Sequence, residues 1–225
     1  MAAAPPTSLC PDCPTARTGL LEPLARGGHG RCAFRCLFVG ARQPLPPRWF
    51  GSYGLALVRR GIVIRQRVDP HGSATATDAV GPGGALPLSD GDDASAGYAV
   101  EDALLCLCPR RRLRAAIDVG APTAGQIVEL HAASLDRVER IVAARARATA
   151  AARVAGLLCA LADTLSPPRR LTLIPAALQQ RDLAALLSMR HESVCRALAA
   201  LSKRGAIVRD PEGIRLADRA RLEAT

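Results

Sequence analysis

Between about residues 31 and 109, hydrophobic residues occur in short runs that alternate with turn-forming residues. The runs are Cys36–Val39, Tyr53–Val58, Ile62–Ile64 and Tyr98–Cys108. Clusters that contain glycine or proline, such as 69–72 and 81–84, separate them. Short strands connected by turns of this kind are typical of an antiparallel barrel or jelly roll. The pattern therefore predicts a β-rich domain in the first half of the chain.

A long helical pattern follows the β region. From about residue 123 to 164 the chain contains no proline, and Leu135, Val138 and Val142 recur at helical spacing. This indicates a long helix with one apolar stripe. The stripe can pair with the same stripe of a second copy, where the many alanines let two backbones approach closely, or it can pack within the chain. We predict a dimerisation helix over 119–165, with intrachain packing as the alternative.

The C-terminal part has the pattern of a helix-turn-helix. The proline-rich segment 166–170 ends the long helix. Two short apolar-periodic segments follow, with buried faces formed by Leu183, Leu186 and Leu187 and by Val194, Leu198 and Leu201. Ser188-Met189 is short enough to be the tight turn between two helices that share a core. Apolar runs at 206–208 and 214–216, on either side of a turn that contains proline and glycine, predict a β-hairpin wing.

Together these patterns predict an α+β fold in three parts. The chain of 225 residues is long enough for two modest domains, and its hydrophobic content of 49% is sufficient for packed cores. We expect an N-terminal cysteine-bearing segment and β domain over 1–118, a dimerisation helix over 119–165, and a winged helix-turn-helix over 166–225.

The second helix of the predicted helix-turn-helix carries candidate base-contacting residues. Glu192 and Arg196 are four residues apart, with Cys195 beside them, so all three are expected to project together near the N-terminus of the helix. In this motif that end enters the major groove. Arginine can bind the O6 and N7 of guanine, and glutamate can accept a hydrogen bond from cytosine N4. The alternative is a surface ion pair, which contributes only a few tenths of a kcal/mol.

Overall charge agrees with a DNA partner. The net charge of +10 and the pI near 10.0 favour a polyanion, although arginine, alanine and glycine enrichment is also typical of a GC-rich genome. The candidate DNA-contacting residues are Arg190, His191, Glu192, Ser193, Cys195, Arg196 and Lys203, with Arg204 and Arg209 as further candidates for phosphate contacts. Phosphate contacts set register and salt dependence without sequence preference.

Other classes of protein lack support in the sequence. The N-terminus has no basic start followed by an apolar run, and no apolar stretch reaches the roughly 20 residues of a membrane span, so we expect a cytoplasmic protein. In a reducing cytosol the eight cysteines are expected to be free thiols, metal ligands or redox sensors. A phosphate-binding glycine loop, a Ser/His/Asp arrangement and a zinc-hydrolase helix are all missing, so the protein is not expected to be an enzyme.

Several motifs resemble those of the CRP/FNR family of bacterial transcription regulators. Residues 192–196, Glu-Ser-Val-Cys-Arg, resemble the family's E-T-V-x-R recognition helix, with Cys195 in place of the serine of the FNR branch. Residues 37–41 resemble the entry to the family's β-roll, 58–63 a hairpin within it, and 81–84 its GPGD corner. The resemblance implies a cyclic-nucleotide-binding-like β-roll, a long dimerisation helix and a winged helix-turn-helix.

The same resemblance implies partners for the protein. A homodimer of this kind contacts a pseudo-palindromic operator in double-stranded DNA, since each copy presents one recognition helix. A half-site resembling the TTGA of the FNR branch is implied, and RNA polymerase is expected as a further partner. Cyclic AMP is not expected as a ligand. Family members that bind it use a Gly-Glu pair and an Arg-Ser pair, and the matching positions here are Pro87-Leu88 and Ala94-Ser95.

The cysteines resemble those of the FNR branch, which holds an oxygen-labile 4Fe–4S cluster. Cys10 and Cys13 resemble its N-terminal C-x-x-C, and Cys106 matches its distant cysteine ligand. Such a cluster usually has four thiolate ligands. The fourth is expected to be Cys32 or Cys36.

Three alternatives remain for the β domain. The same cysteines can act as a thiol redox switch or bind zinc. A haem is a second alternative, with His29, His71 and His131 as candidate axial ligands. A β domain without any ligand is the third. Cys159, on the apolar side of the long helix, is interpreted as a core residue.

Overall fold

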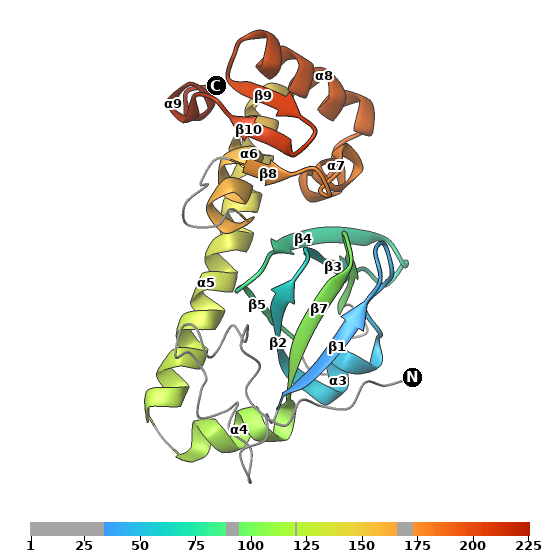
Figure 1. Cartoon of the computed structure of the whole chain (residues 1–225), viewed down its shortest axis with the longest axis vertical. Coiled ribbons are helices and arrows are strands. Elements are labelled where there is room, and N and C mark those ends of the chain that lie inside the picture. Colours follow the sequence, from blue (N-terminus) through green and yellow to red (C-terminus); the bar gives the residue numbers. More distant parts are fainter. Residues whose placement is uncertain (1–33, 89–94, 120, 166–172) are drawn as a thin grey trace. The chain divides into compact units, whose positions relative to one another are not determined.

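The computed structural model describes residues 34–88, 95–119, 121–165 and 173–225 (Figure 1). The described residues divide into two compact units: those within 34–63 and 80–134 form the first unit, and those within 64–79 and 135–225 form the second unit. Within the described residues, none of the helices is long and apolar enough to cross a membrane.

The first unit is built around a four-stranded antiparallel sheet. Its strands, in order across the sheet, are β1 (Arg35–Val39), β7 (Ala103–Pro109), β2 (Tyr53–Arg60) and β5 (Ala85–Pro87). Both faces of β7 are covered. Leu105 and Leu107 point into one core cluster, whereas Cys106 and Cys108 point into the other. Because successive strand residues face opposite sides, this explains the uninterrupted apolar run in the sequence.

Two further elements complete the sheet region of the first unit. Helix α3 (Arg48–Ser52) contributes Trp49 and Phe50 to the core, and β6 (Ser95–Ala99) hydrogen-bonds the segment 42–45. The predicted strand Tyr98–Cys108 is thus two strands, separated by a turn at 100–102. The Asp102 carboxylate stabilises this turn by accepting a hydrogen bond from the Ala41 N–H at 2.8 Å.

Three helices follow the sheet: α4 (Arg110–Val119), α5 (Ala121–Ala146) and α6 (Ala150–Leu165). The prediction of one helix through 119–165 is wrong at 147–149, where the chain bends. At the bend, side chains form hydrogen bonds with backbone groups that lack a partner within a helix. Thr149 Oγ1 accepts from the Ala152 N–H at 3.0 Å, which caps α6, and Arg153 Nε donates to the Arg147 carbonyl at 2.8 Å.

The second unit contains the winged helix-turn-helix. Its elements are α6, β8 (Leu173–Pro175), α7 (Gln180–Leu187), α8 (His191–Lys203), β9 (Ile207–Asp210), β10 (Gly213–Leu216) and α9 (Arg219–Glu223). The predicted wing is present, and the unpredicted β8 extends it to a three-stranded sheet in the order β8-β10-β9. Most of α6 is buried against α8 and α9. The predicted α+β class is confirmed.

A β-hairpin from the N-terminal half also belongs to the second unit. It consists of β3 (Val63–Val68) and β4 (Ala74–Val80). Asp78 of β4 is fully buried, and its carboxylate accepts hydrogen bonds from Nε and Nη2 of Arg137 of α5, the shortest at 3.0 Å. Arg145, near the end of α5, donates to the Leu186 carbonyl of α7 at 2.6 Å and to the Ala76 carbonyl of β4. Arginine side chains therefore attach this hairpin to the helices of the second unit.

Candidate DNA-binding face and cysteine pair

Buried apolar side chains and a capped turn hold the two helices of the helix-turn-helix together. Val194, Leu198 and Leu201 of α8 are completely buried, as the periodicity predicts. Helix α7 begins with a reciprocal cap, in which the Gln179 N–H donates to the Asp182 carboxylate at 2.8 Å. It ends at Ser188, whose φ of 51° lies in the left-handed region. That conformation turns the chain into α8 within three residues and usually favours glycine.

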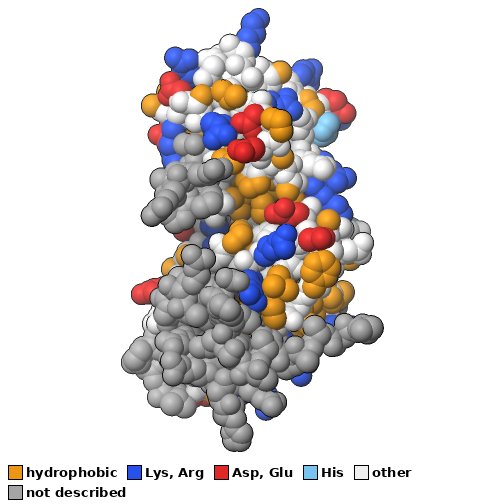
Figure 2. All heavy atoms as spheres, viewed as in Figure 1, with side chains coloured by type: hydrophobic (Ala, Val, Ile, Leu, Met, Phe, Trp, Pro, Cys, Tyr) orange, Lys and Arg blue, Asp and Glu red, His pale blue; other side chains and the backbone are white. Residues whose placement is uncertain are grey.

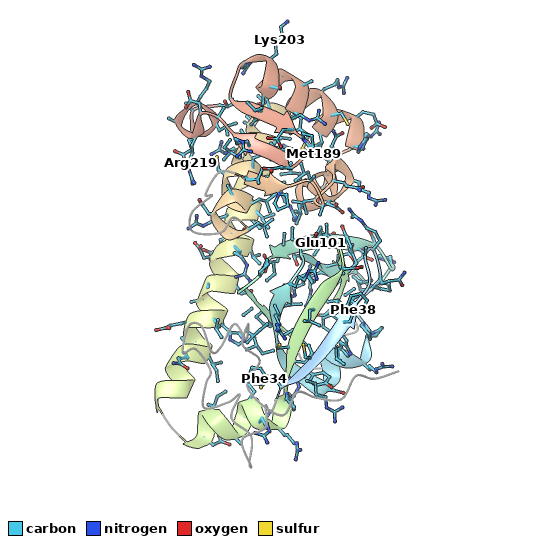
Figure 3. All side chains as sticks on the ribbon, viewed as in Figure 1. Phe34, Phe38, Glu101, Met189, Lys203 and Arg219 are labelled. Carbon is cyan, nitrogen blue, oxygen red and sulfur yellow. The ribbon has the colours of Figure 1, made fainter. Side chains whose placement is uncertain are left out.

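The polar face of α8 presents Glu192 and Arg196 to solvent. Both side chains are exposed, and neither has an ion-pair or hydrogen-bond partner within the described residues. The alternative of an ion pair between them is therefore not formed. Arg190 and His191 are exposed at the start of the helix, Ser193 is half-buried, and Lys203 is exposed at its far end (Figure 3). Most of the predicted contact residues thus share α8 and its N-terminal cap, whereas Arg204 follows α8 and Arg209 lies in β9.

Cys195 differs from its two neighbours on the helix. Its side chain is half-buried, and its thiol donates to Oε1 of Gln180 at 2.6 Å. The ring nitrogens of His191 lie 3.5 and 3.7 Å from the same sulfur. Cys195 thus connects α8 to the first turn of α7. Gln180 was missed by the sequence analysis, since only the packing of the two helices places it beside a residue fifteen positions away.

A groove of about 620 Å³ lies beside the recognition helix in the second unit. Gln180 and Arg181 at the start of α7, His191 of α8 and Arg209 of the wing line it. Figure 2 shows basic, acidic and hydrophobic side chains interspersed over this face of the molecule. Arg209 was a predicted phosphate contact, whereas Arg181 was not predicted. Asp210 also lines the groove, so Arg181 and Arg209 are the lining side chains whose charge suits a DNA backbone.

Helix α5 exposes an apolar stripe. Val128, Leu135 and Val142 are 66%, 58% and 53% exposed, and they are spaced seven residues apart. Val138 is half-buried and Ile141 is buried. A seven-residue repeat of apolar side chains is the pattern by which two helices pair in a coiled coil.

In the first unit, β1 and β7 bring two cysteines together. Cys36 and Cys106 are direct partners in the antiparallel register, and their sulfur atoms are 3.9 Å apart. Cys106 is only 5% exposed, whereas Cys36 is half-buried. The hydrogen bond from Cys106 lowers the pKa of the Cys36 thiol to about 6, with further contributions from a hydrogen bond and the charge of Arg59 against the opposing effect of burial. Burial raises the pKa of Cys108 to about 12.

The structure places only part of the predicted cofactor ligands. Cys10, Cys13 and Cys32 lie outside the described residues, and the described residues contain no group of three or more His, Cys, Asp or Glu side chains suited to a metal ion. Of the two candidates for the fourth ligand, Cys36 is the one shown to adjoin Cys106.

The remaining ligand predictions fall at separate positions. His29 and Ala94 lie outside the described residues, and His71 lies in the turn between β3 and β4. His131 is exposed on α5, and its Nδ1 lies 2.9 Å from the Ile127 carbonyl of the same helix. At the positions matching the cyclic AMP motifs, Leu88 follows the strand residue Pro87 and is buried in the core, and Ser95 is also buried.

Comparison with known proteins identifies the architecture. Residues 152–225 match the model of the Crp-like helix-turn-helix domain. The chain is similar to FixK2 from Bradyrhizobium japonicum, with 21% identity, a TM-score of 0.69 and coverage of 85% of this chain and 96% of FixK2. The C-terminal third of the chain is thus a Crp-like helix-turn-helix domain. The chain therefore carries a DNA-binding domain of the kind found in CRP/FNR transcription regulators.

Two further solved structures share this architecture. A variant of CooA from Carboxydothermus hydrogenoformans is 19% identical, with a TM-score of 0.66 and coverage of 91% of this chain and 94% of that one. A cyclic-nucleotide-binding-domain protein from Listeria monocytogenes is 12% identical, with a TM-score of 0.67 and coverage of 91% and 98%. At these identities the likeness establishes the fold: a cyclic-nucleotide-binding-like β domain with a C-terminal helix-turn-helix. No curated protein is significantly similar to the chain in sequence.

Proposed function

We propose that this chain is a CRP/FNR regulator that binds a pseudo-palindromic operator as a homodimer and distinguishes bases through Glu192 and Arg196. The observation that carries the proposal is the exposure of both side chains, without partners in the described residues, on the polar face of α8. A guanidinium and a carboxylate that are not committed to each other are free to hydrogen-bond base edges in the major groove. The half-site resembles the TTGA of the FNR branch, and RNA polymerase in the cytoplasm is the expected further partner.

The exposed stripe of α5 supports the dimer. Val128, Leu135 and Val142 together place three large apolar side chains in solvent along one side of a single helix. Pairing with the same stripe of a second copy removes them from water and relates the two recognition helices by a two-fold axis. A two-fold arrangement matches half-sites about 34 Å apart, which is one turn of DNA.

The test of DNA recognition is a selection from random-sequence DNA. The wild-type protein is expected to enrich two inverted half-sites separated by one helical turn. The Arg196→Ala variant is expected to enrich a motif that has lost its preference at the base contacted by Arg196, while Arg209→Ala, which removes a phosphate contact from the wing, retains the wild-type motif. Enrichment of the same motif by Arg196→Ala would refute the assigned recognition residues.

The β domain is proposed to sense oxygen, nitric oxide or redox state through an iron–sulfur cluster. Its ligands are proposed to be Cys10, Cys13, Cys106 and Cys36. Cys36 is preferred over Cys32 because it lies beside Cys106. When bound, a cluster of this kind supplies an iron centre that oxygen or nitric oxide can degrade. The protein contributes a buried thiolate ligand from β7 and a more accessible one from β1.

The distance between the two sulfur atoms shows which kind of metal centre the cysteine pair suits. Two thiolates on one tetrahedral metal, each about 2.3 Å from it, are about 3.8 Å apart. The observed 3.9 Å therefore fits two ligands of a single metal ion. A 4Fe–4S cluster holds each thiolate on a different iron, so the half-buried Cys36 side chain has to rotate away from Cys106. The distance accordingly favours zinc, bound by the same cysteines, as a second candidate.

Anaerobic purification with metal analysis tests this site. An iron–sulfur protein is expected to absorb broadly near 400 nm, to contain equal amounts of iron and sulfide, and to lose both in air. Zinc without visible absorption would support the second candidate. The Cys106→Ala variant is expected to lose the metal, whereas Cys108→Ala, its neighbour on the same face of β7, is expected to keep it. A wild-type protein without iron or zinc would refute both.

A further inference from the structure

We infer that Cys36 and Cys106 form a modification site of their own: a dithiol that closes reversibly to a disulfide bond between β1 and β7. This inference concerns the metal-free protein, and it does not depend on the proposed cluster. It rests on the position of the two thiols relative to each other in the sheet.

The antiparallel register supplies the backbone geometry. Cys36 and Cys106 are directly opposite each other, so their side chains project from the same face of the sheet. Opposite residues in such a ladder have Cα atoms about 4.5–5.5 Å apart, which lies inside the range of about 4.4–6.8 Å found for disulfides. The sulfur atoms are 3.9 Å apart, and a bond needs about 2.0 Å. Rotation of the less buried Cys36 side chain can provide this approach without movement of the strands.

The pairing is specific among the cysteines that the structure describes. Cys108 is on the same face of β7, but the β2 residue opposite it is Leu55. Cys159 and Cys195 belong to the second unit, where Cys159 is buried in α6 and the Cys195 thiol hydrogen-bonds Gln180. Within the described chain, Cys36 and Cys106 are thus the cysteines with a sulfur partner in reach.

A hydroperoxide is the oxidant class that fits the site. Cys36 is reached first because it is half-buried, whereas Cys106 is 5% exposed. The Cys36 sulfur attacks one peroxide oxygen, the O–O bond breaks, and hydroxide leaves and takes up the thiol proton as water. The Cys106 sulfur then attacks the Cys36 sulfenic acid, the S–O bond breaks, and the second hydroxide leaves as water with the Cys106 proton. Two thiols and one hydrogen peroxide give one disulfide and two waters; a dithiol reductant returns two electrons.

The surroundings of the pair connect it to the dimerisation helix. Cys106 belongs to the same buried cluster as Phe34, which directly precedes β1, Leu113 of α4 and Ile127 of α5. Closing the disulfide fixes β1 against β7 directly beneath these helices. Since Ile127 is adjacent in sequence to the exposed Val128, the packing of the stripe-bearing helix is the feature that the disulfide is expected to alter.

Peptide mapping of the metal-free, full-length protein tests the inference. The reduced protein is treated with a chelator, desalted, exposed to hydrogen peroxide, alkylated and digested with trypsin. Cys36 then lies in the peptide 36–42, and Cys106 and Cys108 lie together in 68–110. The linked peptides are expected in the wild type and in Cys108→Ala, which assigns the bond to Cys106, and are expected to be absent from Cys36→Ser and Cys106→Ser. Dithiothreitol should separate them.

The outcomes separate this inference from the proposed cluster. A free Cys36 after oxidation, or a Cys36 linked to Cys10 or Cys13 with Cys106 reduced, would overturn the disulfide whatever metal the untreated protein contains. Untreated protein without metal, but with the 36–106 linkage after oxidation, would overturn the cluster and support the disulfide.

Discussion

The recognition helix α8 and the central strand β7 hold their functional side chains in opposite environments. Helix α8 buries Val194, Leu198 and Leu201 and exposes Glu192 and Arg196 on its other side. Strand β7 is buried on both faces, so that Cys106 lies within a core cluster. A contact on α8 can therefore change without cost to the fold, whereas a change in bonding at Cys106 necessarily alters core packing. Such a difference suits a regulator in which one region contacts DNA and the other responds to a signal.

The largest expected effect is a loss of stability when a residue on the buried side of α8 is substituted. Leu198→Ala should lower the free energy of unfolding by about 3 kcal/mol, because it leaves a cavity where the helices of the motif meet. Ala199→Ser, one residue further on the exposed side, should change it by less than about 0.5 kcal/mol. Urea denaturation followed by circular dichroism measures both. Equal effects of the two substitutions would contradict the amphipathic orientation of α8.

The next effect concerns the exposed side of the same helix. Arg196→Ala should reduce discrimination between operator and scrambled DNA by about 2 kcal/mol per half-site, which is about 30-fold, because a bidentate base contact is lost. Stability should stay within about 0.5 kcal/mol of wild type. Lys203→Ala is the matched control: it should weaken binding to both DNAs equally and reduce the slope of affinity against salt by about one. Fluorescence anisotropy at several salt concentrations distinguishes the two.

Substitution of the two cysteines should cost different amounts of stability, because Cys106 of β7 is more buried than Cys36 of β1. In the reduced, metal-free protein, Cys106→Ser should destabilise the fold by about 1–2 kcal/mol, because it buries a hydroxyl among apolar side chains. Cys36→Ser should cost less than about 0.5 kcal/mol, since Cys36 is half-buried. Urea denaturation under reducing conditions provides the comparison. A larger cost for Cys36→Ser would contradict the burial assigned to the pair.

The smallest effect is a difference in thiol reactivity within one face of the sheet. In the reduced, metal-free protein at pH 7, Cys36 should react with iodoacetamide faster than Cys108, because their pKa values are about 6 and about 12. The Cys36 rate should increase as the pH rises through about 6 and level off above it, when the thiol is fully ionised. Arg59→Ala should raise that pKa by removing the guanidinium. Mass spectrometry of each peptide over a pH series measures the rates.

The two regions also differ in how far the sequence predicts them. The helix-turn-helix depends on local periodicity, so the positions of α7, α8 and the wing follow from the spacing of leucine and valine. Ser188 shows the limit of this approach, because the sequence alone does not indicate that a serine adopts the left-handed conformation. The bend at 147–149 contains neither glycine nor proline, and Thr149, which caps α6, is the one local signal for it.

The cysteine pair depends on tertiary structure. Cys36 and Cys106 are 70 residues apart, and their contact requires the register of β1 against β7, which no local pattern specifies. The resemblance implies Cys106 as a ligand, but the sequence leaves Cys32 and Cys36 as equal candidates for the fourth. The partner of Arg137 was not predicted either, because Asp78 lies in a strand that has no strong sequence signal.

The most direct test of the account is the affinity of one anaerobic sample for its selected operator, measured before and after exposure to air. The wild-type protein is predicted to bind the operator tightly without oxygen and to lose affinity in air, while its salt-dependent binding to scrambled DNA is unchanged. Cys106→Ala is predicted to bind with the same affinity under both conditions. Equal operator affinity of the wild type before and after air, with Glu192 and Arg196 intact, would contradict the claim that the cysteines of the first unit control the recognition helix of the second.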